Sequence, residues 1–437
     1  MTEFSHINRE KLPEQWQITH FGNLVKFSMG KTPPRKDKEY WDDGKYAWVS
    51  ISDMIQYGII FDTAEKVSEI AHEKIFRRKL IPPGHILMSF KLTIGRVSKI
   101  GIPAYHNEAI ISFRPDNYII FEDYIFFFLS QINYLNYQDK AIKGNTLNKS
   151  KIAKLEIAYP PLPEQHRIAA ILTAVQRAIE QQERLITLTT ELKKALMQKL
   201  FTEGTRGEPQ KMTEIGPVPE SWEIYRLEEI AQSFTYGTSV KCDYGLVGYP
   251  VLRIPNVVGG HIDVTDLKYG VLKPHEKENL LLKRGDLLFV RTNGVQENAG
   301  RCSMYRGELG DNCYFASYLI RVRLDAGGII PEFVEEYSRT EIGSRFLGGK
   351  AVRTADGKFN INTGTLKDVL VPFPKLDQQV EIVDMLALID DKSAELILYR
   401  QSLQDLFRTL LHQLMTAQIR VNDVDLTELN AIGIEAD

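Results

Sequence analysis

Apolar residues recur every three or four positions along two long stretches of the chain, a spacing typical of amphipathic helices. The first covers about 164–201; the second begins behind Asp377, a residue favoured as a helix N-cap, and its stripe continues from Ile382 to Leu414. At 1.5 Å per residue, each helix would be roughly 55 Å long. Because so long a stripe needs an equally long apolar surface, we expect the helices to form an antiparallel pair. The alternative is that each helix packs only on its own domain.

The regions before each helix contain shorter elements. Apolar strands such as 86–90 (ILMSF) and 287–291 (LLFVR) follow glycine turns, and an apolar helix is predicted near 123–135. The most apolar window, 118–135, is interrupted by Glu122, Asp123 and Gln131, so it predicts a buried helix and not a membrane span. We therefore expect a mixed α/β domain before each long helix.

The chain also repeats itself. LPEQWQITHFGNL at 12–24 returns as VPESWEIYRLEEI at 218–230, Gly84 aligns with Gly285, and Gln165 aligns with Gln379. From that glutamine onward the two helices align without a gap. The repeat predicts an α+β fold with pseudo-two-fold internal symmetry, in which two similar mixed α/β domains are separated by two long helices that form an antiparallel coiled coil. The expected boundaries are domain 1 at 1–160, helix 1 at 161–210, domain 2 at 211–375, helix 2 at 376–420 and an acidic C-terminal tail at 421–437.

Length and charge refine this picture. A chain of 437 residues exceeds the size of a single hydrophobic core, which again favours two or more domains. The formal net charge of −3 does not by itself favour a nucleic-acid partner. Each basic run is compatible with a solvated surface and with a phosphate contact. These runs lie within the two domains, at Lys31, Arg35, Lys36 and Lys38, at Arg77, Arg78 and Lys79, and at Lys350, Arg353 and Lys358.

No catalytic constellation is recognisable in the sequence. Cys242, Cys302 and Cys313 lack the spacing of a zinc site or a disulfide framework. GKTPPR at 30–35 resembles a phosphate-binding loop but has Val25 where that motif needs glycine. The double proline at 160–161 lacks the flanking residues that an amino-methyltransferase uses, and neither a glycine-rich S-adenosylmethionine loop nor an HExxH motif is present. We expect a non-catalytic chain without a metal site, and the lack of a signal peptide favours the cytoplasm.

Five segments resemble the recurring blocks of Type I restriction-modification specificity subunits. In chain order they are GKTPPRKDKEYWDDGKYAWVSISDM, GHILMSFKLTIGRVSKIG, NTLNKSKIAKLEIAYPPLPEQHRIAAIL, GDLLFVRTNG and FNINTGTLKDVLVPFPKLDQQVEIV. The resemblance covers nearly the whole chain, in the family's order of target-recognition domain, spacer helix, target-recognition domain and spacer helix. It implies a DNA-binding protein of bacterial host defence in which each recognition domain reads one half of a split DNA site.

The resemblance also implies partners. These are double-stranded DNA, two methyltransferase subunits docked along the spacer helices, and restriction subunits, with no role for a membrane. It implies no cofactor in this chain, since S-adenosylmethionine would bind the methyltransferase partner, and ATP and Mg the restriction partner. One rival interpretation is a coiled-coil adaptor without DNA binding of its own. Another, a fused endonuclease-methyltransferase, is excluded by the missing motifs unless another chain is involved.

Candidate DNA-binding residues follow from the chemistry of base readout. Arg or Lys suits guanine and Asn or Gln suits adenine, and loops beside glycine turns present them. In the first domain the candidates are Lys31, Thr32, Arg35, Ser89, Lys91, Lys143, Asn145 and Thr146. In the second domain they are Tyr236, Thr238, Lys241, Arg291, Thr292, Asn293, Arg353, Lys358 and Asn360. Each is equally compatible with a base contact, a phosphate contact or a plain loop position.

Overall fold

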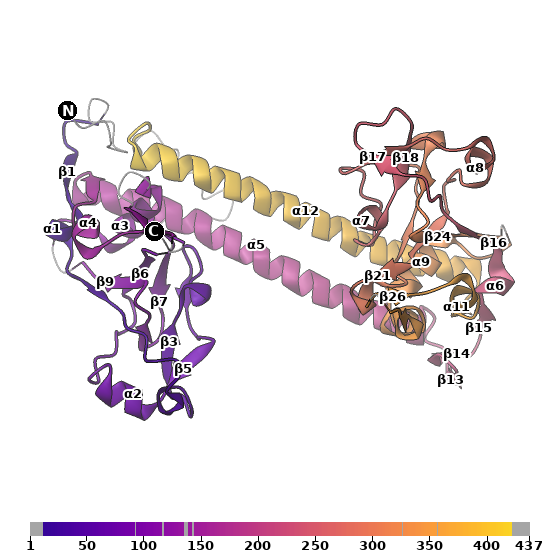
Figure 1. Cartoon of the computed structure of the whole chain (residues 1–437), viewed down its shortest axis with the longest axis horizontal. Helices are drawn as coiled ribbons and strands as arrows, with labels where there is room; N and C mark the ends of the chain where they lie inside the picture. The colour runs from indigo at the N-terminus through magenta and orange to yellow at the C-terminus, as the bar shows by residue number, and fades with distance from the viewer. Residues whose placement is uncertain are drawn as a thin grey trace. The chain divides into compact units, whose positions relative to one another are not determined.

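The computed structural model of the chain describes residues 12–91, 93–115, 118–134, 139–141, 144–325, 327–355 and 357–421. The chain divides into two units: unit 1 comprises 1–184 and 397–437, and unit 2 comprises 185–396. Two long helices, α5 (Leu162–Glu203) and α12 (Leu376–Met415), each begin in one unit and end in the other (Figure 1). Each unit therefore contains part of both helices.

Unit 1 is built on two sheets, with strand orders β2-β9-β6-β7-β4 and β5-β3-β8. A separate antiparallel pair, β1 with β12, precedes the start of α5. The strands are β1 (Gln17–His20), β2 (Phe27–Met29), β3 (Tyr46–Val49), β4 (Ile59–Ile60), β5 (Glu65–Val67), β6 (Ile86–Ser89), β7 (Val97–Ile100), β8 (Ala104–His106), β9 (Ile110–Phe113), β10 (Asp139–Ala141), β11 (Gly144–Thr146) and β12 (Glu156–Tyr159). The short helices are α1 (Phe21–Leu24), α2 (Glu69–Lys74), α3 (Glu122–Phe128) and α4 (Lys149–Ala153).

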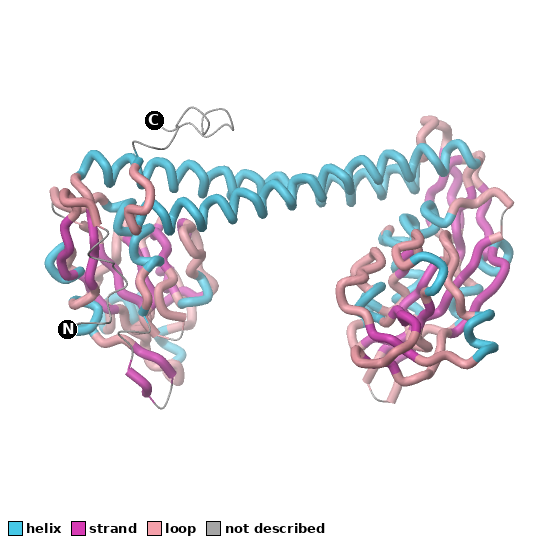
Figure 2. The backbone as a smooth tube through the Cα atoms, turned by 90° about the horizontal axis from the view of Figure 1, so that it is seen from above, coloured by secondary structure: helices cyan, strands magenta, loops and turns pink. Residues whose placement is uncertain are grey.

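Unit 2 has two four-stranded sheets, β16-β24-β20-β22 and β17-β19-β18-β23, and a small sheet β21-β26-β25. Its strands are β13 (Gln210–Thr213), β14 (Gly216–Pro219), β15 (Glu223–Arg226), β16 (Ala231–Tyr236), β17 (Cys242–Asp243), β18 (Tyr249–Leu252), β19 (Lys268–Gly270), β20 (Leu287–Val290), β21 (Thr292–Asn293), β22 (Cys302–Met304), β23 (Tyr314–Phe315), β24 (Leu319–Leu324), β25 (Val352–Arg353), β26 (Phe359–Asn360) and β27 (Leu370–Phe373). Its short helices are α6 (Leu227–Ile230), α7 (Ile254–Val257), α8 (Pro274–Asn279), α9 (Pro331–Arg339), α10 (Glu341–Leu347) and α11 (Thr363–Lys367). Figure 2 distinguishes these strands and helices by colour.

The two units repeat the same topology. The order β2-β9-β6-β7 corresponds to β16-β24-β20-β22, and the antiparallel pair β1–β12 corresponds to β15–β27. The parallel pair β3–β8 likewise corresponds to β18–β23. The predicted α+β fold with an internal repeat is therefore confirmed.

The repeated glutamine has the same structural role in both units. Gln165 is fully buried, accepts a hydrogen bond from the Phe121 amide at 2.7 Å, and donates to the carbonyl oxygens of Ile119 and Pro160. Gln379 makes the equivalent three bonds, accepting from the Ile330 amide and donating to the carbonyl oxygens of Gly328 and Pro374. Because buried backbone groups must be hydrogen-bonded, one amide side chain satisfies three of them at the start of each long helix.

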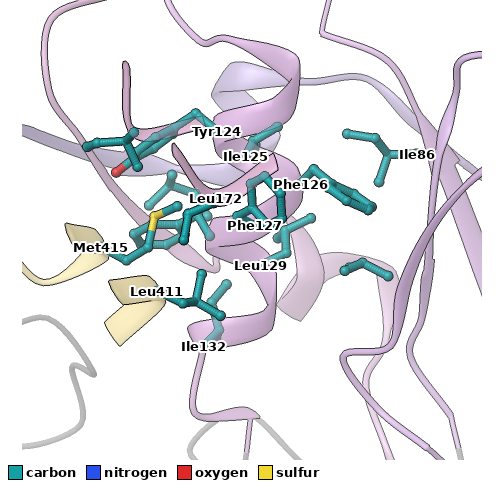
Figure 3. Close-up of a cluster of buried hydrophobic side chains, with 14 of the residues drawn as sticks. Ile86, Tyr124, Ile125, Phe126, Phe127, Leu129, Ile132, Leu172, Leu411 and Met415 are labelled. Carbon is teal, nitrogen blue, oxygen red and sulfur yellow. The ribbon is translucent and has the colours of Figure 1, made fainter. Parts of the chain in front are cut away.

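Both long helices contribute to the core of each unit. In unit 1, side chains of α3 pack with Leu172 of α5 and with Leu411 and Met415 of α12 (Figure 3). In unit 2, Phe201 of α5 and Leu386 of α12 belong to one core. The alternative in which each helix packs only on its own domain is therefore wrong.

Equivalent arginines fix the antiparallel direction of the helices within each unit. Arg420, just beyond α12, donates to both carboxylate oxygens of Glu164 in the first turn of α5, at 2.8 and 2.9 Å. Arg206, just beyond α5, donates to Asp377 and Glu381 in the first turns of α12, at 2.8 Å each. In both units the end of one helix thus lies beside the start of the other.

Two sequence-based details of the helices have different outcomes. Asp377 is not the N-cap, because α12 already begins at Leu376; its carboxylate instead lies in the first helical turn, where it pairs with Arg206. The predicted apolar helix near 123–135 is present as α3 but ends at Phe128, and its side chains from Tyr124 to Phe128 are buried. Within the described ranges, every helix is too short or too polar to cross a membrane.

Candidate nucleic-acid interface

Seven of the nine candidates in unit 2 gather around the small sheet β21-β26-β25. Thr292 is paired with Asn360 and Asn293 with Phe359 in the register of β21 and β26, and Arg353 lies opposite Phe359 on β25. Lys358 directly precedes β26 and is exposed. The tight hairpin depends on Gly357, whose φ of 82° lies in the left-handed region that glycine adopts without cost. The remaining two of the seven are Tyr236 and Arg291.

Arg291 is held in place from several sides. Its guanidinium lies over the Tyr236 ring, 4.9 Å from the centroid, and its Nη1 donates to the Ser317 carbonyl oxygen at 3.3 Å. The Tyr236 hydroxyl accepts a hydrogen bond from the Thr363 amide at 3.1 Å, so the ring is itself anchored to α11. The Arg291 backbone carbonyl accepts from the Ile361 amide, which joins this arginine to the end of β26. An arginine oriented in this way loses little conformational entropy when it binds a planar acceptor pair.

Two polar atoms at this sheet have no partner among the described residues. They are Nε of Arg291, a donor, and Oδ1 of Asn360, an acceptor, and both are buried. Buried polar atoms are normally hydrogen-bonded, so an unpaired donor and an unpaired acceptor near this sheet favour a polar ligand here. The exposed edges of bases supply both kinds of group.

In unit 1, Arg35 is held between aromatic rings and a carboxylate. Its guanidinium lies 4.0 Å from the ring centroid of Trp41 and 4.9 Å from that of Trp48, and it forms two hydrogen bonds with the Glu65 carboxylate. The hydrogen bond to Glu65 raises the pKa of Arg35 above its ordinary value, so its charge is permanent. About half of the side chain is exposed (52%), so Arg35 remains accessible to solvent.

The neighbouring candidates Lys31 and Thr32 have internal partners. The Lys31 ammonium donates to the Ile75 carbonyl oxygen at 3.2 Å, and the Thr32 hydroxyl donates to Glu108. Lys91 lies two residues after the end of β6 and is half-buried. These side chains belong to unit 1, but the structure does not gather them around a single small sheet as it does in unit 2.

Part of the candidate surface of unit 1 lies outside the described residues. Lys143 is among the residues that are not described, and of Asn145 and Thr146 only the backbone is described, as part of β11. In the backbone register of the β10–β11 hairpin, Lys140 is opposite Asn145 and Asp139 is opposite Thr146.

Ser89 and Thr238 are buried, and their hydroxyls bond within the protein. The Ser89 hydroxyl donates to the Thr93 carbonyl oxygen and accepts from the Arg96 amide, while that of Thr238 donates to Glu276 at 2.8 Å. We therefore leave both out of the interface proposed below. Sequence reasoning selected them because they border glycine turns, a signal that does not distinguish a hydroxyl pointing outward from one that stabilises the turn.

The last candidate of unit 2, Lys241, is exposed and directly precedes β17. Strand β17 pairs with β19 and not with a strand of the small sheet, so Lys241 does not belong to that neighbourhood. Sequence reasoning missed Tyr318, whose side chain is 56% exposed and whose carbonyl oxygen accepts from the Arg291 amide. An aromatic side chain beside an ordered arginine suits stacking on a base or sugar. Its sequence signal was weak, since a tyrosine beside a strand is usually part of a core.

Comparison with known proteins identifies this architecture. The sequence model of the Type I restriction modification DNA specificity domain matches residues 13–190. The EcoKI specificity subunit of Escherichia coli K12 is 26% identical over 385 residues, covering 85% of this chain and 82% of the relative. The MjaVIII specificity subunit of Methanocaldococcus jannaschii is 24% identical over 440 residues and covers 97% of both chains. The chain is similar to Type I specificity subunits over most of its length.

Solved structures show the same fold at low sequence identity. The S subunit of a Type I system from M. genitalium has a TM-score of 0.53 at 15% identity and covers 92% of this chain and 97% of its own. A chain from a structural study of complex assembly and conformational transition of the type I R-M system has a TM-score of 0.55 at 16% identity and covers 94% of this chain. The chain therefore shares its fold with these S-subunit structures along nearly its full length.

Proposed function

We propose that this chain is the DNA-reading specificity subunit of a Type I restriction-modification complex, in which each unit reads one half of a bipartite DNA site. The observation that carries the proposal is duplication. The DNA specificity domain matches 13–190, and unit 2 repeats the strand topology of that domain although its loops differ. Since the loops carry the readable side chains, two copies on one chain read two unlike half-sites. A coiled-coil adaptor without DNA binding would not account for the DNA specificity domain.

In the proposed complex this chain contributes recognition and not catalysis. S-adenosylmethionine would bind to the methyltransferase partner, and ATP and Mg to the restriction partner. Activity would therefore depend on assembly.

Exposed leucines on α5 support the docking of methyltransferase subunits along the helices. Leu185, Leu188 and Leu192 are 44%, 50% and 58% exposed, and their spacing of three and four residues places them on one face of α5. Apolar side chains gathered on one exposed face are typical of a protein interface. Leu188→Glu should therefore reduce the amount of methyltransferase subunit that co-purifies with the chain, while Thr189→Glu, one position away, provides a control on the same helix.

The recognition function is tested by mapping methylated bases in the genome of a host that carries the whole system. We expect a bipartite motif. Arg291→Ala should relax the preference at one position of one half-site, at a cost of about 1–3 kcal/mol if Arg291 reads a guanine. Arg291→Lys keeps the charge but replaces the planar, fixed pair of guanidinium donors by a flexible ammonium group, so it should relax the same position.

Two results would contradict this function. If Arg291→Ala weakened binding of the complex to every DNA sequence by the same factor, Arg291 would be a phosphate contact. If the assembled wild-type complex did not shift duplex DNA in a gel, the chain would be an adaptor.

A further inference from the structure

A strained basic turn follows α2 in unit 1. After Lys74, the chain continues as Ile75-Phe76-Arg77-Arg78-Lys79, and the side chains of Arg77, Arg78 and Lys79 are exposed. Arg77 and Arg78 have φ values of 52° and 58°, in the left-handed region. This conformation costs roughly 1–2 kcal/mol for a residue other than glycine. Two consecutive arginines here, where glycine would cost nothing, indicate that their side chains serve a purpose.

The base of the turn is rigid. Phe76 is 9% exposed and stacks on the Tyr105 ring, with the centroids 3.8 Å apart. The Arg78 amide donates to the His72 carbonyl oxygen at 2.8 Å, and the Lys79 amide donates to that of Phe76 at 3.1 Å. The turn is thus held by buried contacts, and its charged side chains need not order the backbone when they bind.

Several cations of this turn are without a carboxylate partner. Arg78 pairs with Glu73, but within the described ranges Lys74, Arg77 and Lys79 form no ion pair. The ammonium group of Lys31 adds a further charge at the base of the turn, since it donates to the Ile75 carbonyl oxygen. Lys31 was already a candidate for DNA binding, so the basic turn adjoins the candidate surface of unit 1.

Unit 2 lacks this turn. The helix that corresponds to α2 is α8, and only residues 280–284 separate its end at Asn279 from Gly285, whereas 75–83 separate Lys74 from Gly84. The extra residues of unit 1 include the two arginines. The feature therefore does not belong to the framework that the two units share.

We propose that the turn 74–79 binds the phosphate backbone of DNA at the half-site of unit 1, independently of base sequence. The inference rests on the proposed DNA-reading function and extends it to residues outside the base-reading loops. Exposed Arg and Lys side chains on a rigid support neutralise phosphates and release counterions, which strengthens binding most at low salt. A purely structural role is the competing explanation, since basic groups stabilise the C-terminal end of a helix.

The test uses the full chain co-purified with the methyltransferase subunit of its system. Binding to a duplex with the mapped site and to a scrambled duplex is measured by fluorescence anisotropy across a series of KCl concentrations. The double variant Arg77→Gly with Lys79→Ala removes two charges, and glycine relieves the left-handed strain, so folding is not impaired. Arg77→Lys with Lys79→Arg keeps both charges, and Lys154→Ala removes an exposed charge elsewhere in unit 1.

We expect the double variant to bind both duplexes more weakly and to lower the slope of log affinity against log salt by about one unit for each phosphate that the turn no longer neutralises. The charge-preserving variant and Lys154→Ala should keep the wild-type slope. An unchanged slope in the double variant, or a weakening confined to the mapped site, would overturn the inference while leaving the recognition function intact. A decrease in co-purified methyltransferase without a change in slope would also overturn the inference, because the turn would then be a protein-binding surface. Failure of the wild-type complex to bind either duplex would instead refute the proposed function itself.

Discussion

The same position of the repeat holds an apolar contact in unit 1 and an ion pair in unit 2. In unit 1, Phe127 of α3 packs against Phe407 of α12, with ring centroids 6.0 Å apart. The offset that aligns Gln165 with Gln379 also aligns Lys193 of α5 with Phe407 of α12. The amides of Phe121 and Ile330 bond to the two glutamines, so these two residues correspond to each other. The offset between them aligns Phe127 of α3 with Glu336 of α9. Lys193 and Glu336 lie 3.5 Å apart. The framework keeps the contact between domain and helix but not its chemistry.

The charged contact of unit 2 requires more partner residues than the apolar contact of unit 1. Lys193 also pairs with Asp390 of α12, 2.7 Å away, and Glu336 also pairs with Arg339. Glu335, which is fully buried, bonds to Arg306 and to the Met304 amide. Because a buried charge is costly unless it is paired, unit 2 needs a network where unit 1 needs two rings. A duplicated fold therefore tolerates a change of interaction type wherever neighbouring residues can compensate.

Removing the ring on the apolar side should strongly destabilise unit 1. Phe407→Ala should destabilise unit 1 by about 3–5 kcal/mol, because it leaves a cavity among Phe127, Phe126 and Tyr57. Hydrogen exchange measured peptide by peptide should show faster opening of α3 and of the C-terminal part of α12. Phe407→Leu, which refills most of the cavity, is the matched control. Equal protection in the alanine variant and the wild type would contradict the assigned packing.

The paired glutamines should instead behave alike. Gln165→Leu and Gln379→Leu each leave three backbone groups without their partner, and each unpaired buried group costs about 1–3 kcal/mol. Hydrogen exchange near residues 119–121 and 328–330 should therefore accelerate to a similar degree in the two variants. Gln→Glu at either position retains the acceptor and loses the donor, which separates the two contributions. If hydrogen exchange accelerated in only one of the two variants, the two glutamines would not have equivalent roles.

Breaking the ion pair should cost less than losing the ring. Lys193→Met removes the partner of Glu336, but Arg339 remains beside that carboxylate, and the Asp390 side chain is 49% exposed. We expect a decrease in stability of about 1–2 kcal/mol, measured by chemical denaturation, because Arg339 still pairs with the Glu336 carboxylate. In the double variant Lys193→Met with Glu336→Leu, most of this stability should be recovered. A double variant less stable than the sum of the single changes would contradict the pairing.

The smallest expected effect is a dependence on pH. Burial raises the pKa of Glu336 above its ordinary value of 4.5, against the opposing effects of Arg339 and Lys193. The folded state therefore binds this proton more tightly than the unfolded state, and stability falls as the pH rises from about 4.5 to the raised pKa. Glu336→Gln should remove this part of the decline, so its stability relative to the wild type should grow with pH across that window and then level off. Denaturation midpoints compared between about pH 4 and pH 8 test it.

Much of the architecture follows from the sequence because its signals are periodic or repeated. The apolar stripes predicted both long helices, and Gly204, with φ of 66°, follows the end of α5 as expected of a glycine there. The repeated segments predicted two similar α/β domains before any strand order was known. The candidate residues of unit 2 include seven that share one neighbourhood, because loops beside glycine turns converge on the same edge of a domain.

Other features depend on contacts between residues far apart in the chain. The sequence does not show that Ser89 and Thr238 are buried, that Arg291 rests on Tyr236, or that Arg77 has a positive φ. Nor does it reveal that Lys193 takes the place of a phenylalanine, because a lysine on a long helix is ordinarily solvated. Periodicity is a property of consecutive residues and can be read from them, whereas the environment of a side chain depends on the elements packed around it. The duplicated framework and its helices can therefore be read from consecutive residues, whereas the burial or exposure of a polar side chain follows from the packing of elements that are distant in the chain.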